Sequence, residues 1–179
     1  MNRKLSAIIF SFLILFNSSV VIANIHNISD VEIGFSPGHK AIQIILSAIE
    51  KSQRSVYVAA YSFTSKPIAL ALLKAQKRGV NVRLVVDKKS NTGKYTAVTY
   101  LVNHFVPVRL NNKYSIMHNK FMIIDNNSVE TGSFNYTKNA AYHNAENIIY
   151  IKNRVDIASK YLHEFERLWN EGEDAKSKY

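Results

Sequence analysis

Residues 118 to 135 place polar side chains of chemically useful types at short, fixed spacing. His118 and Lys120 stand two residues apart, so on an extended strand their side chains project from the same face. A neighbouring cation favours the neutral form of an imidazole, which is the form that a nitrogen nucleophile needs. The ammonium group also supplies positive charge where phosphoryl oxygens gather negative charge in a transition state. This pair therefore suits the transfer of a phosphoryl group.

Two further polar residues, Ser133 and Asn135, repeat the same spacing after a second expected strand. Between the two pairs lie the apolar run 121–124, turn-forming residues at 125–127 and a second run from Val129, which together predict strand, turn and strand. A hydroxyl and an amide can both donate hydrogen bonds to the non-bridging oxygens of a phosphate. Ser133 and Asn135 are therefore expected phosphate-binding groups.

The spacing H-x-K-x-x-x-x-D followed by G-S-x-N resembles the signature of the phospholipase D superfamily, and every position of that signature is filled here. The resemblance implies a phosphodiesterase in which His118 attacks phosphorus and forms a phosphohistidine. It also implies that Lys120, Ser133 and Asn135 line the phosphate pocket. In the nuclease-type members a glutamate after G-S-x-N orients the nucleophile, and Glu146 of the segment NAENIIYI stands in that place. A carboxylate that accepts the Nδ1 proton of the histidine would leave Nε2 free to attack.

Asp125 is the aspartate of the signature and completes an expected catalytic set of His118, Lys120, Asp125 and Glu146. Its position is out of phase with the strand alternation that starts at His118, so we expect a supporting role. The prediction is that Asp125 ties the strands of the motif together and does not touch the substrate.

The resemblance covers nearly the whole chain after residue 30, including AYSFTS at 60–65, RGVNVRLVVD at 78–87 and a long C-terminal helix. Two groups fit: the small secreted phospholipase D of obligate intracellular bacteria and the bacterial single-motif endonuclease. We favour phospholipase D activity, which would hydrolyse phosphatidylcholine-type lipids to phosphatidic acid and a head-group alcohol. A metal-independent, non-specific endonuclease acting on DNA or RNA is the alternative.

The resemblance also predicts a homodimer. Superfamily enzymes use two such histidines, one to attack and one to protonate the leaving oxygen, whereas this chain carries one copy of the motif. Two subunits would then share an active site on a two-fold axis. No cofactor is expected, and neither is a metal, because the sequence has no cysteine and no H-E-x-x-H pattern.

The N-terminus predicts export. A basic start at Arg3 and Lys4, a twelve-residue apolar core and small residues ending at Ala23 are typical of a secretory signal peptide. The apolar core is short for a membrane-spanning anchor, which needs roughly twenty residues. We therefore expect residues 1–23 to be removed, leaving a single domain at 24–179 that is secreted or periplasmic. Loss of the two basic residues lowers the formal charge from +10 to +8.

Less specific explanations exist for several of these features. Ser133 and Asn135 could simply cap a helix beginning near Thr137. Glu146 could be an ordinary polar residue at the start of a strand. The basic charge could belong to a non-enzymatic module that binds anionic surfaces, with only peripheral membrane contact. The complete motif favours an enzyme, because a module that only binds has no need of it.

The apolar patterns alternate between strand and helix along the chain, which predicts an α/β fold with a mixed β-sheet flanked by helices on both faces. Pro67 near the start of one expected helix and Gly79 just after its end occupy positions that suit these residues. The expected strands lie at 31–35, 55–61, 81–86, 106–110, 119–125, 128–133 and 146–151. The expected helices lie at 38–52, 66–78, 94–104 and 153–170.

Overall fold

A computed structural model describes residues 31–93 and 96–177, so the expected signal peptide lies outside the described residues. The described chain forms an eight-stranded sheet in the order β1-β7-β6-β5-β2-β3-β4-β8. The strands are β1 (Val31–Ser36), β2 (Ser55–Ala60), β3 (Asn81–Asp87), β4 (Val108–Asn111), β5 (Lys120–Ile124), β6 (Ser128–Gly132), β7 (Glu146–Ile151) and β8 (Glu173–Asp174). The helices are α1 (Lys40–Lys51), α2 (Lys66–Lys77), α3 (Ala97–Asn103), α4 (Lys138–Tyr142) and α5 (Val155–Glu171), with a 3-10 turn at Lys89–Asn91.

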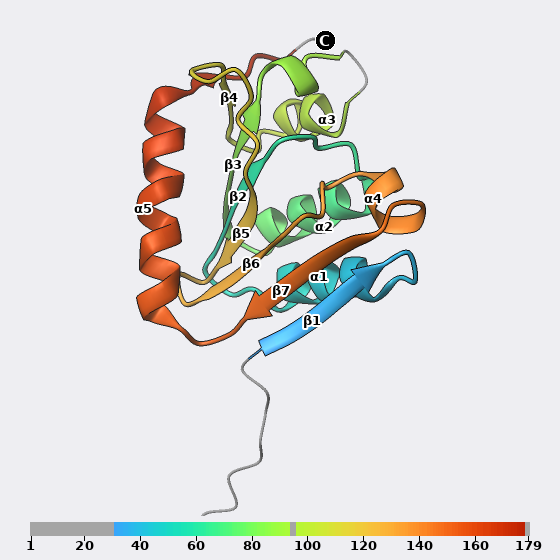
Figure 1. Cartoon of the computed structure of the whole chain (residues 1–179). Helices are drawn as coiled ribbons and strands as arrows, with labels where there is room; N and C mark the ends of the chain where they lie inside the picture. The colour runs from blue at the N-terminus through green and yellow to red at the C-terminus, as the bar shows by residue number, and fades with distance from the viewer. Residues whose placement is uncertain (1–30, 94–95, 178–179) are drawn as a thin grey trace, which may run out of the picture.

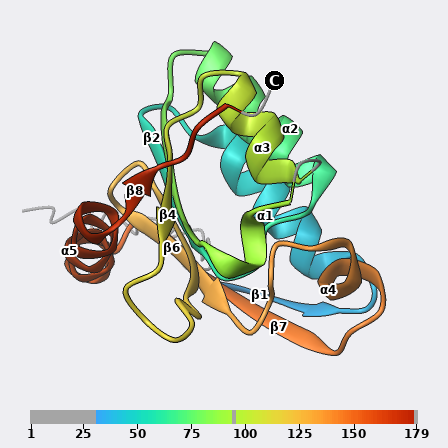
Figure 2. The same ribbon diagram turned by 90° about the horizontal axis from the view of Figure 1, so that it is seen from above.

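The sheet separates two layers of helices. Helices α1, α2 and α3 cover one face, while α5 runs alone across the other (Figures 1 and 2). Each face carries its own apolar cluster, one built around Ile45, Leu72 and Met122 and the other around Phe121 and Phe165. Every residue of the central strands β2 and β5 is buried, because both of their faces are covered. Burial of these two clusters is the main favourable term that holds the layers together.

Local sequence explains where α2 begins and ends. The Ser65 side chain caps the helix by accepting a hydrogen bond from the backbone N–H of Ile68, and Pro67 lies in the first turn. Gly79, two residues beyond the helix, adopts φ 91°, a left-handed conformation that glycine adopts without steric cost. This sharp stop returns the chain directly into β3.

None of the described helices is long and apolar enough to cross a lipid bilayer.

The predicted fold class is confirmed, and each expected strand and helix has a counterpart in the structure. Helix α3 is shorter than expected, since it begins at Ala97 behind the capping side chain of Thr96. The expected elements do not include the two-residue strand β8, and α4 is anticipated only as a helix beginning near Thr137. Both are too short to show a periodic apolar pattern. Thr137, and neither Ser133 nor Asn135, caps α4 by accepting a hydrogen bond from the backbone N–H of Ala140.

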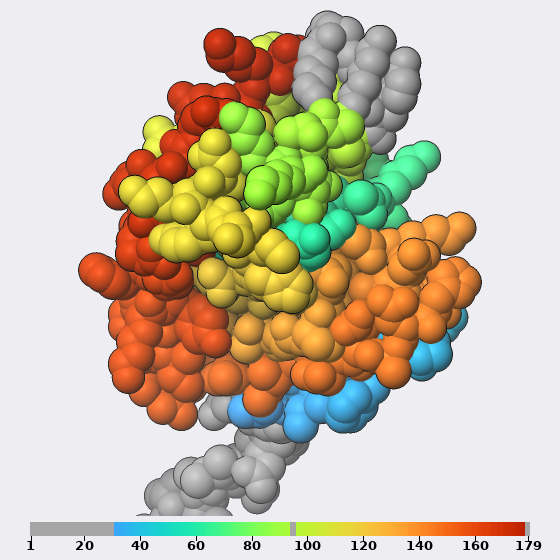
Figure 3. Space-filling view, turned by 45° about the horizontal axis from the view of Figure 1, so that its top comes forward, coloured from blue at the N-terminus to red at the C-terminus, as the bar shows by residue number. Residues whose placement is uncertain are grey.

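Sheet topology brings several strand ends to one edge. Strands β2, β3 and β4 run parallel to one another, so their carboxyl ends lie together. Strand β5 runs antiparallel to β2, and β6 and β7 follow in antiparallel order, so β5 and β7 begin at this edge and β6 ends there. Figure 3 shows the yellow segment that precedes β5 next to the orange segment between β6 and β7 on one surface of the molecule.

Candidate active site

The motif residues meet at this edge of the sheet. His118 lies two residues ahead of β5, and Lys120 is the first residue of that strand. Ser133 directly follows β6, and Glu146 is the first residue of β7. The predicted association of these residues therefore has a structural basis in the antiparallel order of β5, β6 and β7.

The histidine and the lysine are in direct contact. The Nζ atom of Lys120 lies 3.1 Å from Nδ1 of His118 and donates to the His118 carbonyl oxygen at 2.7 Å. Because an ammonium group can only donate, Nδ1 is the acceptor in this arrangement. The imidazole is exposed, whereas Lys120 is 9% exposed. Burial lowers the pKa of Lys120, and the Glu146 carboxylate opposes that effect.

Glu146 is bound to the phosphate-pocket serine. Its Oε2 atom accepts a hydrogen bond from Ser133 Oγ at 2.5 Å, and its Oε1 atom accepts one from the side-chain amide of Asn144 at 3.0 Å. The serine oxygen accepts in turn from the backbone N–H of Asn147 at 3.1 Å. The expected contact between Glu146 and His118 is not made within the described chain, because Lys120 occupies Nδ1 and the carboxylate faces the serine. The orienting role of Glu146 toward a histidine stays a prediction.

Asn135 carries an unsatisfied polar atom. Its side-chain Oδ1 is buried and has no hydrogen-bond partner among the described residues, while its backbone oxygen accepts from the N–H of Thr137 at 2.7 Å. Buried polar groups without a partner are uncommon and costly, so a ligand or water is expected to meet this amide. The geometry agrees with a side chain held ready for a polar ligand.

Asp125 lies at the opposite end of β5 from the histidine. Its carboxylate accepts hydrogen bonds from the backbone N–H groups of Gln53, Arg54 and Ser55 at 2.6 to 3.1 Å. Ser55 begins β2, so the aspartate ties the start of β2 to the β5–β6 turn. This geometry agrees with the predicted supporting role, in which Asp125 ties the strands of the motif together.

An open hollow of about 360 Å³ adjoins the motif on the α5 face of the sheet. The sequence interpretation did not include Tyr161 of α5, which lines it, or Asn144 and Asn147, which hold the serine and the glutamate. These residues become neighbours of the motif only through strand register and helix docking. The hollow is lined by His118, Asn119, Lys120, Phe121, Thr131, Gly132, Ser133 and Tyr161.

Gly132 shows why the motif needs glycine at that position. A Cβ atom there would lie 2.1 Å from the backbone oxygen of Asn147 and 2.8 Å from Cα of Ile148. The backbones of β6 and β7 approach too closely for any side chain. This close approach sets Ser133 beside Glu146.

Across the described residues, no three histidine, cysteine or acidic side chains come together as a set that could hold a metal ion.

Comparison with known proteins places this geometry in a family. Residues 45–169 match the family model described as "Cardiolipin synthase, PLD-like domain". The phospholipase D of Rickettsia prowazekii is 38% identical over 134 residues, which are 75% of this chain and 65% of the relative. The mitochondrial cardiolipin hydrolase of Xenopus tropicalis is 35% identical over 135 residues, 75% of this chain and 64% of the relative. The chain thus spans just under two thirds of the length of these relatives.

Solved structures give the same result for the fold. Nuc from Salmonella typhimurium, described as a phospholipase D family member, is 41% identical with a TM-score of 0.79, and the match covers 82% of this chain and 98% of Nuc. NucT from Helicobacter pylori is 26% identical with a TM-score of 0.73, covering 81% and 98% of the two chains. The chain belongs to the phospholipase D superfamily, as a member with a PLD-like domain.

Proposed function

We propose that the protein is a phosphodiesterase that cleaves a P–O bond through a phosphohistidine at His118. The observation that carries the proposal is the contact of His118 with Lys120 at 3.1 Å, beside an open hollow that also contains Ser133. In the first step an imidazole nitrogen forms a bond to phosphorus while the bond to the leaving alcohol oxygen breaks. Water then cleaves the N–P bond and releases the phosphomonoester. Lys120, Ser133 and Asn135 stabilise the negative charge on the non-bridging oxygens.

The first step also requires a proton for the leaving oxygen. We propose that the same histidine of a second copy supplies it, in a homodimer with the active site on the two-fold axis. Each oxygen of Glu146 accepts one hydrogen bond within the chain, so each retains a lone pair. The carboxylate is thus available to orient a histidine across the axis, which its own subunit's geometry does not allow.

An exposed apolar surface beside the site suits this second copy. Ile33 and Phe35 of β1 are 56% and 63% exposed and alternate with Gly34, which contacts α1. The side chains of Ile33 and Phe35 therefore point to the face of the sheet opposite α1. Helix α5 packs on that face but does not extend over the outer strand β1 (Figure 2). Phe35 pairs with Asn147 of β7, whose backbone binds Ser133, so this β1 surface leads directly into the site.

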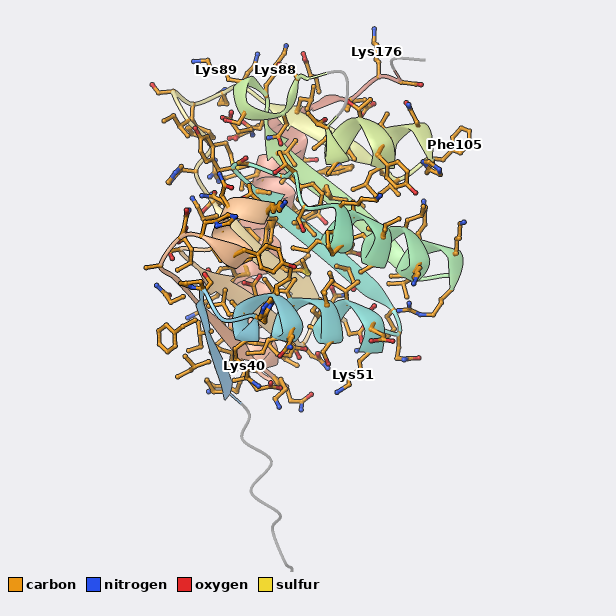
Figure 4. The ribbon with its side chains drawn as sticks, turned by 90° about the vertical axis from the view of Figure 1, so that its right-hand side faces the viewer. Lys40, Lys51, Lys88, Lys89, Phe105 and Lys176 are labelled. Atoms are coloured by element: carbon orange, nitrogen blue, oxygen red, sulfur yellow. The ribbon has the colours of Figure 1, made fainter. Side chains whose placement is uncertain are left out.

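The dimer can be tested on the β1 surface. Phe35→Asp should convert the protein to a monomer and lower turnover more than about 100-fold, because the second histidine is lost. Phe105→Asp is a matched control, since Phe105 is 89% exposed and projects from the other side of the molecule (Figure 4). Light scattering and turnover are measured on the same samples. A fully active monomer would refute the shared site.

For the substrate we propose phosphatidylcholine-type lipids, hydrolysed to phosphatidic acid and the head-group alcohol. The support is the similarity to proteins that are named a phospholipase D and a mitochondrial cardiolipin hydrolase. Export through residues 1–23 would bring such an enzyme to membranes, where peripheral contact suffices. Sequencing the N-terminus of protein recovered from outside the cytoplasm tests the export proposal.

Nucleic acid is the second candidate, and the distribution of basic residues favours it. Lys66, Lys88 and Lys113 lie beyond the carboxyl ends of β2, β3 and β4, on the side of the sheet that carries the catalytic edge. Lys88, which also pairs with Glu173, projects together with Lys89 at one corner (Figure 4). Cations at this edge would attract the repeating phosphates of a polyanionic strand. The net charge of the whole chain, +10, acts in the same direction.

Parallel assays separate these candidates. The protein and its His118→Asn variant are tested on phosphatidylcholine vesicles, on plasmid DNA and on RNA. Choline release that requires His118 supports the lipid substrate, whereas rapid nucleic-acid cleavage without choline release supports the endonuclease. Salt-sensitive binding with no turnover on any of them would favour the non-enzymatic module and contradict the proposed function.

A further inference from the structure

An aromatic side chain outside the motif contacts both the histidine and the lysine. The ring of Tyr61 lies 4.6 Å from the His118 ring, centroid to centroid, with the two planes inclined by 53°. The Nζ atom of Lys120 lies 5.4 Å from the centroid of the same tyrosine ring. Both distances are within the range of favourable aromatic and cation–π contacts. Tyr61 is half-buried, so its ring forms one wall against an otherwise exposed imidazole.

The backbone holds this tyrosine in place from two sides. Its N–H donates to the Asn119 carbonyl at 2.9 Å, which extends the pairing of β2 and β5 by one residue. Its carbonyl oxygen accepts from the side-chain amide of Asn91 at 2.7 Å. Asn91 is itself 2% exposed, and its amide also bonds the Asp87 carbonyl and the Phe63 N–H. The buried asparagine thus fixes the segment that carries Tyr61.

We propose that Tyr61 is a positioning residue for the nucleophile, an inference that rests on the proposed function. Its ring restricts rotation of the His118 imidazole. Among the described residues, the other side chain in contact with this imidazole is Lys120. The ring also contacts the ammonium of Lys120, which lies against Nδ1. The aromatic ring performs this role, because the Tyr61 hydroxyl makes no hydrogen bond among the described residues. Orientation of a reacting group within about 1 Å can change a rate by about 100-fold.

The test compares Tyr61→Leu with Tyr61→Phe on bis(4-nitrophenyl) phosphate. The leucine variant should lower kcat by roughly 10- to 100-fold with KM within about twofold, because the substrate pocket is unchanged while the nucleophile loses its orientation. The phenylalanine variant should stay within about twofold of wild type. In NMR spectra, the imidazole C–H signals of His118 should move from their ring-shifted positions in the leucine variant only.

Tyr100→Leu is the matched control. Tyr100 is also half-buried and also contacts a histidine, His104, with a centroid distance of 4.2 Å, but it lies on α3. It should reduce stability without lowering kcat. Tyr61→Met, which keeps bulk without a ring, replaces the leucine variant if that protein does not fold, and it should show the same loss of kcat.

The outcomes separate this inference from the proposed function. Wild-type kcat in the folded Tyr61→Leu or Tyr61→Met variant would overturn the positioning role, as would an equal loss of kcat in Tyr61→Phe. Turnover that survives in His118→Asn would instead overturn the proposed function, whatever the tyrosine variants do.

Discussion

Replacing Glu130 by glutamine should remove much of the pH dependence of the protein's stability. Glu130 of β6 is 1% exposed, and its Oε2 atom accepts a hydrogen bond from the hydroxyl of the equally buried Tyr136 at 2.7 Å. Burial raises the pKa of Glu130 from 4.5 to about 8, and the bond from Tyr136 opposes part of that rise. The carboxyl group is therefore neutral in the folded protein at pH values where it is ionised in the unfolded chain.

The sign and size of the effect follow by linkage. Because the pKa of Glu130 is higher in the folded protein than in the unfolded chain, protonation of Glu130 stabilises the folded protein. This contribution is fully present below about pH 4.5 and is lost as the pH rises to about 8. At about 1.4 kcal/mol for each pH unit, this range corresponds to a loss on the order of 5 kcal/mol in the free energy of unfolding. Such a loss is a large fraction of the stability of an ordinary domain.

The assay is urea unfolding at pH 5, 6.5 and 8, followed by circular dichroism. Wild type should lose stability across this series, whereas Glu130→Gln should change much less, because the amide stays neutral and still accepts from Tyr136. Glu50→Gln, a change at an exposed position of α1, should follow wild type. If the free energy of unfolding changed with pH in the same way for wild type and Glu130→Gln, the raised pKa assigned to Glu130 would be refuted.

Three further predictions concern the motif. Gly132→Ala should lower the free energy of unfolding by roughly 3 kcal/mol or more and abolish turnover, because its Cβ would meet the β7 backbone at 2.1 Å. Urea unfolding and activity assays measure the two effects, and unchanged activity would contradict the close approach. Asp125→Ala should lower the free energy of unfolding by about 2 kcal/mol, because three backbone N–H groups lose their acceptor. The kcat of the folded variant should stay within about twofold of wild type, and a large loss of kcat with normal stability would instead give Asp125 a catalytic role. Prolonged treatment with a chelator should leave turnover unchanged, because Lys120 supplies the positive charge at the phosphate; loss of activity that zinc or calcium restores would reverse this expectation.

Much of the fold could be predicted from sequence because local patterns report local structure. The apolar runs of β2, β3 and β5 are long enough to mark buried strands, and Pro67 and Gly79 mark the limits of α2. The spacing of His118 and Lys120 gave the contact between them for the same reason, since residues two apart on a strand share a face. Short elements such as α4 carry too few residues to show a period.

The missing parts of the site depend on contacts between distant segments. Glu146 contacts Ser133 and not His118 because the register of β6 and β7 decides which side chains are neighbours. Tyr61 reaches the histidine only because β2 pairs with β5, which the linear sequence does not state. Each of these contacts requires the strand order of the sheet to be known first.

The most direct test of the account is to trap the covalent intermediate. The protein is mixed with bis(4-nitrophenyl) phosphate, quenched in base after a few milliseconds to seconds, digested and analysed by mass spectrometry. The peptide containing His118 should gain the mass of the phosphoryl ester left after one nitrophenol has departed, and His118→Asn should show no such gain. An adduct on any other residue, or full turnover with no covalent adduct at any time, would contradict it.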